Sequence, residues 1–171
     1  MMRRAFTLVE VLVVVMILAI LAAVVMPNLA SAAAPMPGTI AKVLEVDMRR
    51  ASIEAIGRVE AVALVVSANR DSWWIAEQDA IATPVPGTFR RLGSGPLEPF
   101  AGYTLEIDAD GAPLAPGDTT VAGFDFVGAR DERTLEVRLI APEVPDAVAT
   151  WLLEPQCTRF ITEQVRDGGG W

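Results

Sequence analysis

The feature that most constrains this chain is an apolar run near its N-terminus that holds a single acidic residue. Val11 to Met26 is unbroken apolar, and from Phe6 to Met26 only Thr7 and Glu10 interrupt the pattern. At about 1.5 Å rise per residue, the run forms a helix of roughly 30 Å, the thickness of a bilayer core. A carboxylate at the centre of a bilayer costs on the order of 2–3 kcal/mol, and less near its edge. Glu10 therefore predicts a helix that lies in lipid at one stage and at another stage packs where its carboxylate meets a positive partner.

The overall composition argues against several classes of function. The chain carries a net charge of −8, and Arg3 and Arg4 precede the apolar run, so the remainder is more acidic still. An acidic surface does not favour nucleic acid as a partner. The sequence contains no histidine, which is the commonest general base and metal ligand, and Cys157 is its only cysteine. We therefore expect no enzymatic activity and no nucleic-acid partner, and an internal disulfide is impossible.

Three export or anchoring signals fit parts of this N-terminus. The arginine pair, the apolar run and Ala30-Ser31-Ala32 resemble a secretory signal with its cleavage site. Arg3-Arg4-Ala5-Phe6 is similar to a twin-arginine signal, and the run by itself would serve as a permanent single-pass anchor. The run is longer than the roughly 7–15 residues usual for a signal core. None of the three explains Glu10.

A fourth interpretation accounts for the acidic residue. Ala5 precedes Phe6-Thr7-Leu8-Val9-Glu10 at the start of the run, and Val25-Met26-Pro27-Asn28-Leu29 stands at its end. This arrangement resembles the N-terminal signal of type IV prepilins and type II secretion pseudopilins. In that family a short basic leader and a small residue, usually glycine, precede Phe-Thr-Leu-(Val/Ile)-Glu. The residues around Pro27 are similar to the family's helix-kinking proline region.

The resemblance implies a route of processing and assembly. A prepilin peptidase would cleave between Ala5 and Phe6 and methylate the new amine of Phe6. Glu10 would then pair with the N-terminal amine of a neighbouring subunit, since a charge that is costly in lipid becomes favourable when paired in a low-dielectric bundle. The basic leader favours a cytoplasmic N-terminus in the bacterial inner membrane and a periplasmic C-terminal domain. Expected partners are other pilin or pseudopilin subunits, the peptidase, membrane lipid and an inner-membrane assembly platform.

The chain divides by composition into five expected segments. They are a leader (1–5), a hydrophobic transmembrane and filament-core helix (6–34), a joint rich in proline (35–38), a globular periplasmic domain (39–166) and a flexible tail (167–171). Pro27 should kink the first helix, because proline removes a backbone hydrogen bond and clashes with the preceding turn. A simple helix stop at the membrane edge is the alternative interpretation of Pro27.

The globular domain shows a helical segment followed by strands. Thr39 is a favourable N-cap for a helix that ends near Gly57. Strands are expected at 59–66, 73–75, 103–107, 121–127, 134–140 and 147–153, the last as the closing strand, with a turn at 69–71 and a hairpin turn at Asp110-Gly111. We therefore predict an α+β fold in which a long N-terminal hydrophobic helix is followed by a second helix packed on an antiparallel β-sheet.

The stretch from Arg49 to Glu60 narrows the resemblance. Its sequence, RRASIEAIGRVE, leads into a valine-rich strand and resembles the minor pseudopilin H class, whose members carry an arginine-rich helix end followed by a strand pair. The likeness covers about residues 45–80. A major pilin-like subunit stays open as an alternative, because the residues around Pro27 are also similar to major pseudopilins.

Acidic side chains offer the main candidates for a metal or catalytic site. Asp108, Asp110 and Asp118 are carboxylates of the kind that bind calcium, and major pseudopilins have a calcium loop. Asp-Ala-Asp-Gly is also the sequence that a hairpin turn selects, and the turn is the favoured interpretation. Glu106 and Glu136 alternate with apolar residues along strands, which favours exposure to solvent over a catalytic pair.

Two other residue types leave alternatives open. Cys157 has no histidine to activate it, so an inert thiol is favoured over a nucleophile. Trp73 and Trp74 should point to opposite faces of a strand. Core packing is favoured there over a ligand platform, with one of the two rings available for a contact between subunits.

These observations predict a non-enzymatic structural subunit without a cofactor. Its class is a minor pseudopilin of a type II secretion-like pseudopilus. The nearest alternative is a type IV pilin used for adhesion, motility or DNA uptake. The alternative from another class is a membrane-anchored or secreted ligand-binding domain whose N-terminus only imitates the motif.

Overall fold

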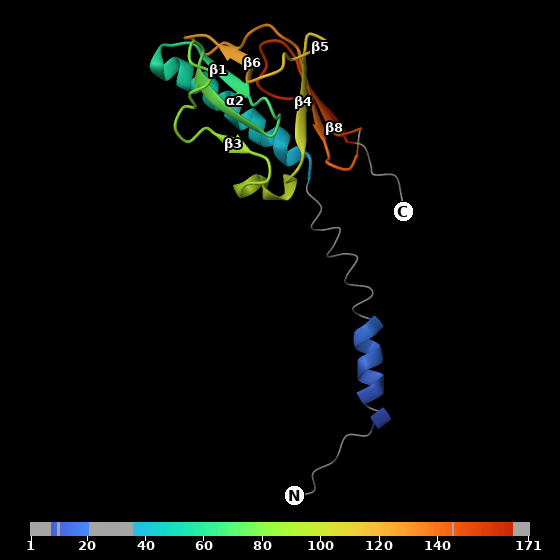
Figure 1. The fold of residues 1–171 in the computed structure, drawn as a ribbon. Helices are drawn as coiled ribbons and strands as arrows, with labels where there is room; N and C mark the ends of the chain where they lie inside the picture. Colours follow the sequence, from blue (N-terminus) through green and yellow to red (C-terminus); the bar gives the residue numbers. More distant parts are fainter. Residues whose placement is uncertain (1–7, 10, 21–35, 145, 166–171) are drawn as a thin grey trace, which may run out of the picture. The chain divides into compact units, whose positions relative to one another are not determined.

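The structure, a computed structural model, describes residues 8–9, 11–20, 36–144 and 146–165 (Figure 1). The chain separates into two compact units, Met1–Pro35 and Met36–Trp171. In the first unit, residues 8–9 and 11–20 are helical, and each large apolar side chain there is between 48% and 81% exposed. Within the described residues, no helix has both the length and the apolar character required to traverse a bilayer.

The second unit, called the body below, begins with one helix and continues with strands. The helix α2 spans Gly38–Arg58. The strands are β1 (Val62–Val66), β2 (Ser72–Glu77), β3 (Arg90–Arg91), β4 (Thr104–Ala109), β5 (Ala112–Pro113), β6 (Thr119–Phe124), β7 (Leu135–Ile140), β8 (Ala147–Leu153) and β9 (Thr162–Val165). A 3₁₀ helix, η1 (Gly95–Phe100), lies between β3 and β4.

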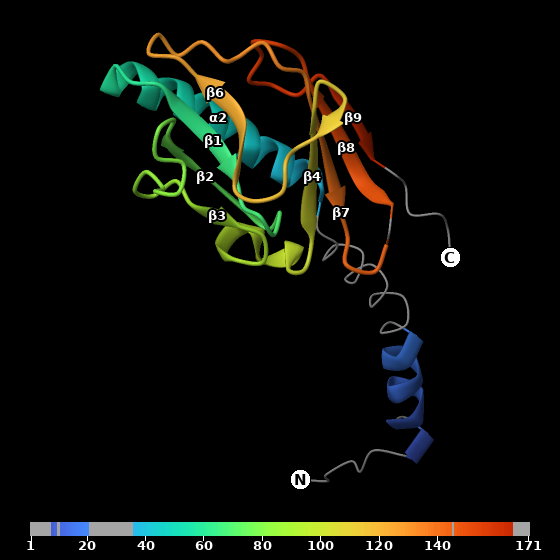
Figure 2. The same ribbon diagram turned by 45° about the horizontal axis from the view of Figure 1, so that its top comes forward.

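The strands form two antiparallel sheets, where a single sheet was expected. One has the order β3-β2-β1-β6 and the other β5-β4-β7-β8-β9 (Figure 2). β6 pairs with β1, whereas β7, the next strand along the chain, pairs with β4 and β8. The chain therefore changes sheets between β6 and β7. The α+β class is confirmed, and α2 packs against β1 and β6 while its buried side shares one apolar core with both sheets.

The predicted N-cap of α2, Thr39, was wrong, whereas the predicted end near Gly57 lies next to the observed end at Arg58. The helix starts at Gly38, and Pro37 occupies the N-cap with helical dihedral angles and no side-chain cap. Because the backbone N–H groups of Thr39 and Ile40 donate to the carbonyls of Met36 and Pro37 at 2.9 Å, Thr39 is not needed as a cap. At the other end the helix continues through Gly57 and closes at Val59.

Val59 takes the left-handed conformation that usually selects glycine, with φ of 58°. Its N–H donates to the carbonyl of Ile56, and the N–H of Glu60 donates to the carbonyl of Ala55. These bonds satisfy the last carbonyls of the helix and turn the chain into β1. A strand over the whole of 59–66 was therefore too long, because residues 59–61 make this turn.

Two further strand predictions needed correction. The segment 121–127 is strand only as far as Phe124, and residues 125–128 form a tight turn. The closing strand at 147–153 is present as β8 with the predicted bounds, but β9 follows it and forms the edge of the second sheet. The alternation in β7 is confirmed, with Leu135, Val137 and Leu139 buried.

Both faces of the first sheet are covered. β1 is buried at every position. Leu64 and Val66 face the core shared with α2, whereas Ala63 and Val65 pack with Trp74, Ala76 and Ile81 in a second small cluster. The segment after β2 therefore covers the face of the sheet that α2 does not reach.

Candidate functional site

The N-terminal motif is the main candidate site, and the structure describes part of it. Residues 8–9 and 11–20 are helical with exposed apolar side chains. The residues to which the sequence assigns cleavage, methylation, assembly and kinking lie outside the described residues: Ala5, Phe6, Glu10 and Pro27. Their roles rest on the sequence alone. The predicted tail, 167–171, also lies outside the described residues.

The three candidate calcium ligands serve separate contacts in the body. Asp108 accepts a hydrogen bond from Nη2 of Arg138 at 2.8 Å. Asp110 accepts from the backbone N–H of Thr134, and Asp118 from that of Ala68, both at 2.9 Å. In the described part of the chain, no group of three or more histidine, cysteine or acidic side chains is placed to hold a metal ion.

The hairpin interpretation of Asp110 and Gly111 is confirmed. Ala109 at the end of β4 faces Ala112 at the start of β5, which leaves two residues in the turn. Both have positive φ, 52° and 77°, as a type I′ hairpin requires. The Asp-Ala-Asp-Gly sequence is thus accounted for by the backbone.

Glu106 and Glu136 lie on the outer face of the second sheet, on either side of Arg138. Their side chains are 55% and 45% exposed, and their carboxylates stand 3.6 and 3.9 Å from the guanidinium. Together with Asp108, they form an ion cluster across β4 and β7. The expectation of exposed alternating residues is confirmed.

The two tryptophans do point to opposite faces of β2, and each is buried. Trp73 lies in the main core, and Trp74 lies in the small cluster beneath the segment after β2. Nε1 of Trp74 donates to the carbonyl of Ile81 at 2.7 Å, and its ring stacks on Phe89 at 6.0 Å between centroids. Neither ring is exposed enough to serve as a subunit contact or ligand platform. Cys157 is partly buried against the core.

Asp47 is a structural site that the sequence analysis missed. It lies on the buried side of α2 with 1% of its surface exposed. It accepts a hydrogen bond from Nε1 of Trp73 at 2.9 Å and forms an ion pair with Nε of Arg90 at 3.3 Å. A buried carboxylate requires such partners, and these join α2 to β2 and β3. The signal was its position, three residues after Leu44 and four before Ala51, within the apolar face.

Arg130 is a second buried charge that the sequence did not reveal. Its side chain is fully buried, and its Nη2 donates to the carbonyls of Arg133 and Glu154, which ties the segment after β6 to the end of β8. Burial lowers the pKa of the Arg130 guanidinium, and the neighbouring carboxylate of Asp131 partly counters that shift. Nε of Arg130 has no hydrogen-bond partner among the described residues.

Asp71, in the turn between β1 and β2, has a perturbed pKa. Burial alone would raise the pKa of this carboxyl, but hydrogen bonds from Ser72 and Ser67 and the guanidinium of Arg91 outweigh burial and lower it. Arg91 stands 3.1 Å from the carboxylate. Asp71 is therefore held ionised as part of the turn.

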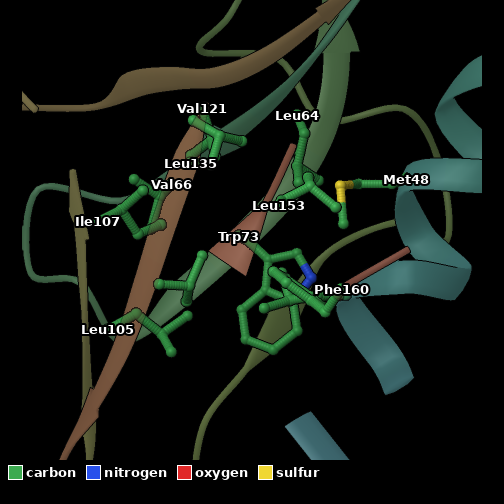
Figure 3. A pocket seen from close by; sticks show the side chains of 12 residues that line it. Met48, Leu64, Val66, Trp73, Leu105, Ile107, Val121, Leu135, Leu153 and Phe160 are labelled. Atoms are coloured by element: carbon green, nitrogen blue, oxygen red, sulfur yellow. The ribbon is translucent and has the colours of Figure 1, made fainter. Parts of the chain in front are cut away.

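The space between α2 and the two sheets is almost filled. A cavity of about 10 Å³ remains there, with a lining that is entirely apolar and includes Met48, Leu64, Trp73, Leu105 and Phe160 (Figure 3). A single water needs a space of about this size together with polar partners. This cavity is therefore a packing defect of the core and too small for an organic ligand.

In the described part of the body, α2 packs with two antiparallel sheets. In the sequence, the body follows an N-terminal segment whose described apolar side chains are exposed. Residues 1–26 match the family described as the prokaryotic N-terminal methylation motif. That motif is the hallmark of type IV pilins and pseudopilins, and it implies processing by prepilin peptidase. It also implies assembly with other pilin subunits. The chain matches none of the curated proteins or solved structures with which it was compared.

Proposed function

We propose that this chain is a minor pseudopilin of the H class, a non-catalytic structural subunit of a type II secretion-like pseudopilus. The observation that carries the proposal is the methylation motif at residues 1–26, with Glu10 inside an otherwise apolar run. The arginine-rich end of α2 followed by the β1–β2 pair supports the narrower class. No metal or organic cofactor is part of the proposal.

The body supports this proposal through what its polar residues do. The carboxylates of Asp47, Asp71, Asp108, Asp110 and Asp118 all accept hydrogen bonds from the body itself. Among the described residues, the core leaves no cavity of ligand size between α2 and the sheets. The large apolar side chains of residues 8–9 and 11–20, by contrast, are exposed. A surface of this kind needs lipid or other protein chains to cover it.

The proposed mechanism has three steps. Cleavage between Ala5 and Phe6 removes the basic leader and creates an amine at Phe6. The apolar helix then spans the inner membrane once, with the body in the periplasm. As the helix enters a growing bundle of helices, the carboxylate of Glu10 pairs with the amine of a neighbouring subunit, since a paired charge is favourable where an unpaired one is costly.

Substitution at Glu10 tests this mechanism in cells that contain the native secretion system. Glu10→Leu should leave cleavage and membrane insertion intact and abolish incorporation into the crosslinked filament. Glu10→Gln keeps the shape without the charge and should fail in the same way. Val9→Leu, an apolar exchange at the neighbouring position, is the matched control and should assemble as the unaltered chain does.

Incorporation of Glu10→Leu at the level of the control would contradict the proposed role of the charge. The secretion class is tested separately by deleting the gene. Loss of secreted cargo with surface pili intact supports a pseudopilin. Loss of pili with normal secretion supports the type IV pilin alternative.

A further inference from the structure

Exposed apolar side chains gather on the outer side of α2 and on the turn that follows β6. Val46, Ile53 and Ile56 of α2 and Phe126 and Val127 of the turn are between 53% and 68% exposed. Val46, Arg49, Ile53 and Ile56 follow one another at spacings of three and four residues, which places them along one side of the helix. These five residues and Arg49 are called the α2–turn surface below.

The turn is fixed in place against the helix. Its backbone is closed by Asp125, whose carboxylate accepts from the N–H groups of Val127 and Ala129 at 3.1 and 2.8 Å. Ser52 of α2 donates to the carbonyl of Gly128 at 2.7 Å. A Cβ on Gly128 would lie 2.7 Å from Cδ1 of Ile56. The backbone of the turn is therefore packed directly against the Ile56 side chain of the helix. In both views the segment after β6 lies beside the end of α2 (Figures 1 and 2).

The hydrogen bonds that hold the turn distinguish its exposed side chains from apolar residues that are exposed by chance. A turn closed by its own carboxylate holds the backbone of Phe126 and Val127 in one position, so little backbone entropy is lost when a partner covers them. Aromatic side chains and arginine are enriched at protein–protein contacts, and Phe126 and Arg49 are such residues on this surface. Single scattered apolar residues would need no such explanation.

The charge of the surface indicates what covers it. Lys42 and Arg49, on the outer side of α2, form no ion pair with any described residue. They stand on a chain whose net charge is −8. Two cationic side chains beside the apolar ones on α2 fit an acidic partner. It fits anionic lipid less well, because the acidic remainder of the body would be repelled by such a membrane.

We propose that the α2–turn surface docks the globular domain of an adjoining pilin-like subunit, through an apolar contact bordered by carboxylates on that subunit. This inference rests on the proposed function, since the motif at residues 1–26 supplies the reason to expect neighbouring subunits. The contact is a heterologous one, in which different patches of two subunits meet. Contacts of this type build open helical assemblies when the rotation between subunits does not close a ring.

A photocrosslinking amino acid tests the docking in the full chain within its native assembly. Benzoylphenylalanine placed at position 126 should crosslink to a chain that carries a methylated prepilin-type N-terminus, identified by mass spectrometry. The matched control is position 89, because Phe89 is also an exposed aromatic residue, 51% exposed, but lies against Trp74 on the other face of the first sheet. Position 89 should give no such crosslink.

Charge reversal tests the chemistry of the partner. Ile53→Glu places a carboxylate against the carboxylates of the partner and should reduce incorporation by about tenfold or more. Ile53→Lys removes the same apolar contact but keeps the favourable sign, and should reduce incorporation by less than about threefold. Phe89→Glu should have no effect.

Three results would overturn the inference: crosslinks from position 126 to lipid, no crosslink in a chain that is present in the filament, or equal losses for the glutamate and lysine variants. These failures are distinct from failure of the proposed function. If the unaltered chain never enters a filament with its N-terminal motif intact, the proposed function itself is wrong. If the chain enters the filament and position 126 stays free, only the docking surface is wrong.

Discussion

Two acidic residues stand within apolar helical sequence in this chain, and the two regions treat them differently. Asp47 faces the core from α2 and receives both a hydrogen bond from Trp73 and an ion pair from Arg90. Glu10 belongs to a run in which no basic residue occurs between Val11 and Met26. The body thus provides the partner for its buried charge, whereas under the proposed function the partner of Glu10 is the amine of a neighbouring subunit.

The apolar side chains show the same difference. In β1 every side chain is buried by the body itself. In residues 11–20 the same residue types are exposed, from 48% upward. The body therefore buries the apolar side chains of β1 itself, whereas those of residues 11–20 need another surface to cover them.

The largest effect is expected where the buried charge of the body is removed. Asp47→Ala leaves the Trp73 N–H and the Arg90 guanidinium without their partner and should lower the free energy of unfolding by about 3–5 kcal/mol. Asp47→Asn keeps an acceptor for Trp73 and should cost less. Chemical denaturation of the full chain in detergent measures both. Asp79 is exposed. If Asp47→Ala lowers the free energy of unfolding no more than Asp79→Ala does, the stabilising role of the buried Asp47 is wrong.

Leucine truncation compares the two regions directly. Leu139 is fully buried in β7, and its replacement by alanine should lower the free energy of unfolding by about 2–5 kcal/mol. Leu12 is 61% exposed, and the same replacement there should lower the free energy of unfolding of the isolated chain by less than about 0.5 kcal/mol. The same denaturation experiment in detergent applies to both variants. Equal losses would show that the N-terminal helix packs within its own chain.

Glycine substitution tests the packing of the turn after β6 against α2. Gly128 and Gly111 both have positive φ, 80° and 77°. A Cβ on Gly128 would collide with Ile56 and Ser52, while one on Gly111 meets nothing within 4 Å. Gly128→Ala should therefore destabilise the body by about 1–3 kcal/mol more than Gly111→Ala does. Thermal unfolding measures the stability of both variants. Equal losses of stability would contradict the close contact between Gly128 and α2.

The smallest effect is the pH dependence that Asp71 contributes. Its folded pKa is lowered from the ordinary 3.8, so its stabilising contribution is fully present above the unfolded pKa. The contribution is lost as the pH falls below about 4 and through the folded value. In Asp71→Asn the difference in unfolding free energy from the unaltered chain should be constant above about pH 5 and shrink below it. A difference that does not change between pH 6 and 3 would contradict this assignment.

Much of the body could be predicted from local pattern, because alternation and turn chemistry act within a few residues. β7 and β8 were predicted within one residue, and Asp110-Gly111 fixed its hairpin. The partition into two sheets was not predictable in this way. It depends on β6 pairing with β1 rather than with β7, the next strand along the chain. The local sequences of β6 and β7 do not determine that pairing.

The structural roles of Asp47 and Arg130 were missed for a related reason. Asp47 is marked in the sequence only by its position on the apolar face of α2, and Arg130 has no such mark. The burial of Asp47 depends on Arg90, and that of Arg130 on the carbonyl of Glu154, both far along the chain. The N-terminal motif behaves in the opposite way. Its information lies in the identities and spacing of Ala5, Phe6 and Glu10, so it can be read without any knowledge of the fold.

The mass of the N-terminal peptide of the mature protein, taken from membranes of cells with an active prepilin peptidase, tests the central claim most directly. We predict a peptide that begins at Phe6 and carries one methyl group on its amine. A chain that begins at Ala33, as a secretory signal would give, or one that retains Met1 to Ala5, would contradict the pilin-like account.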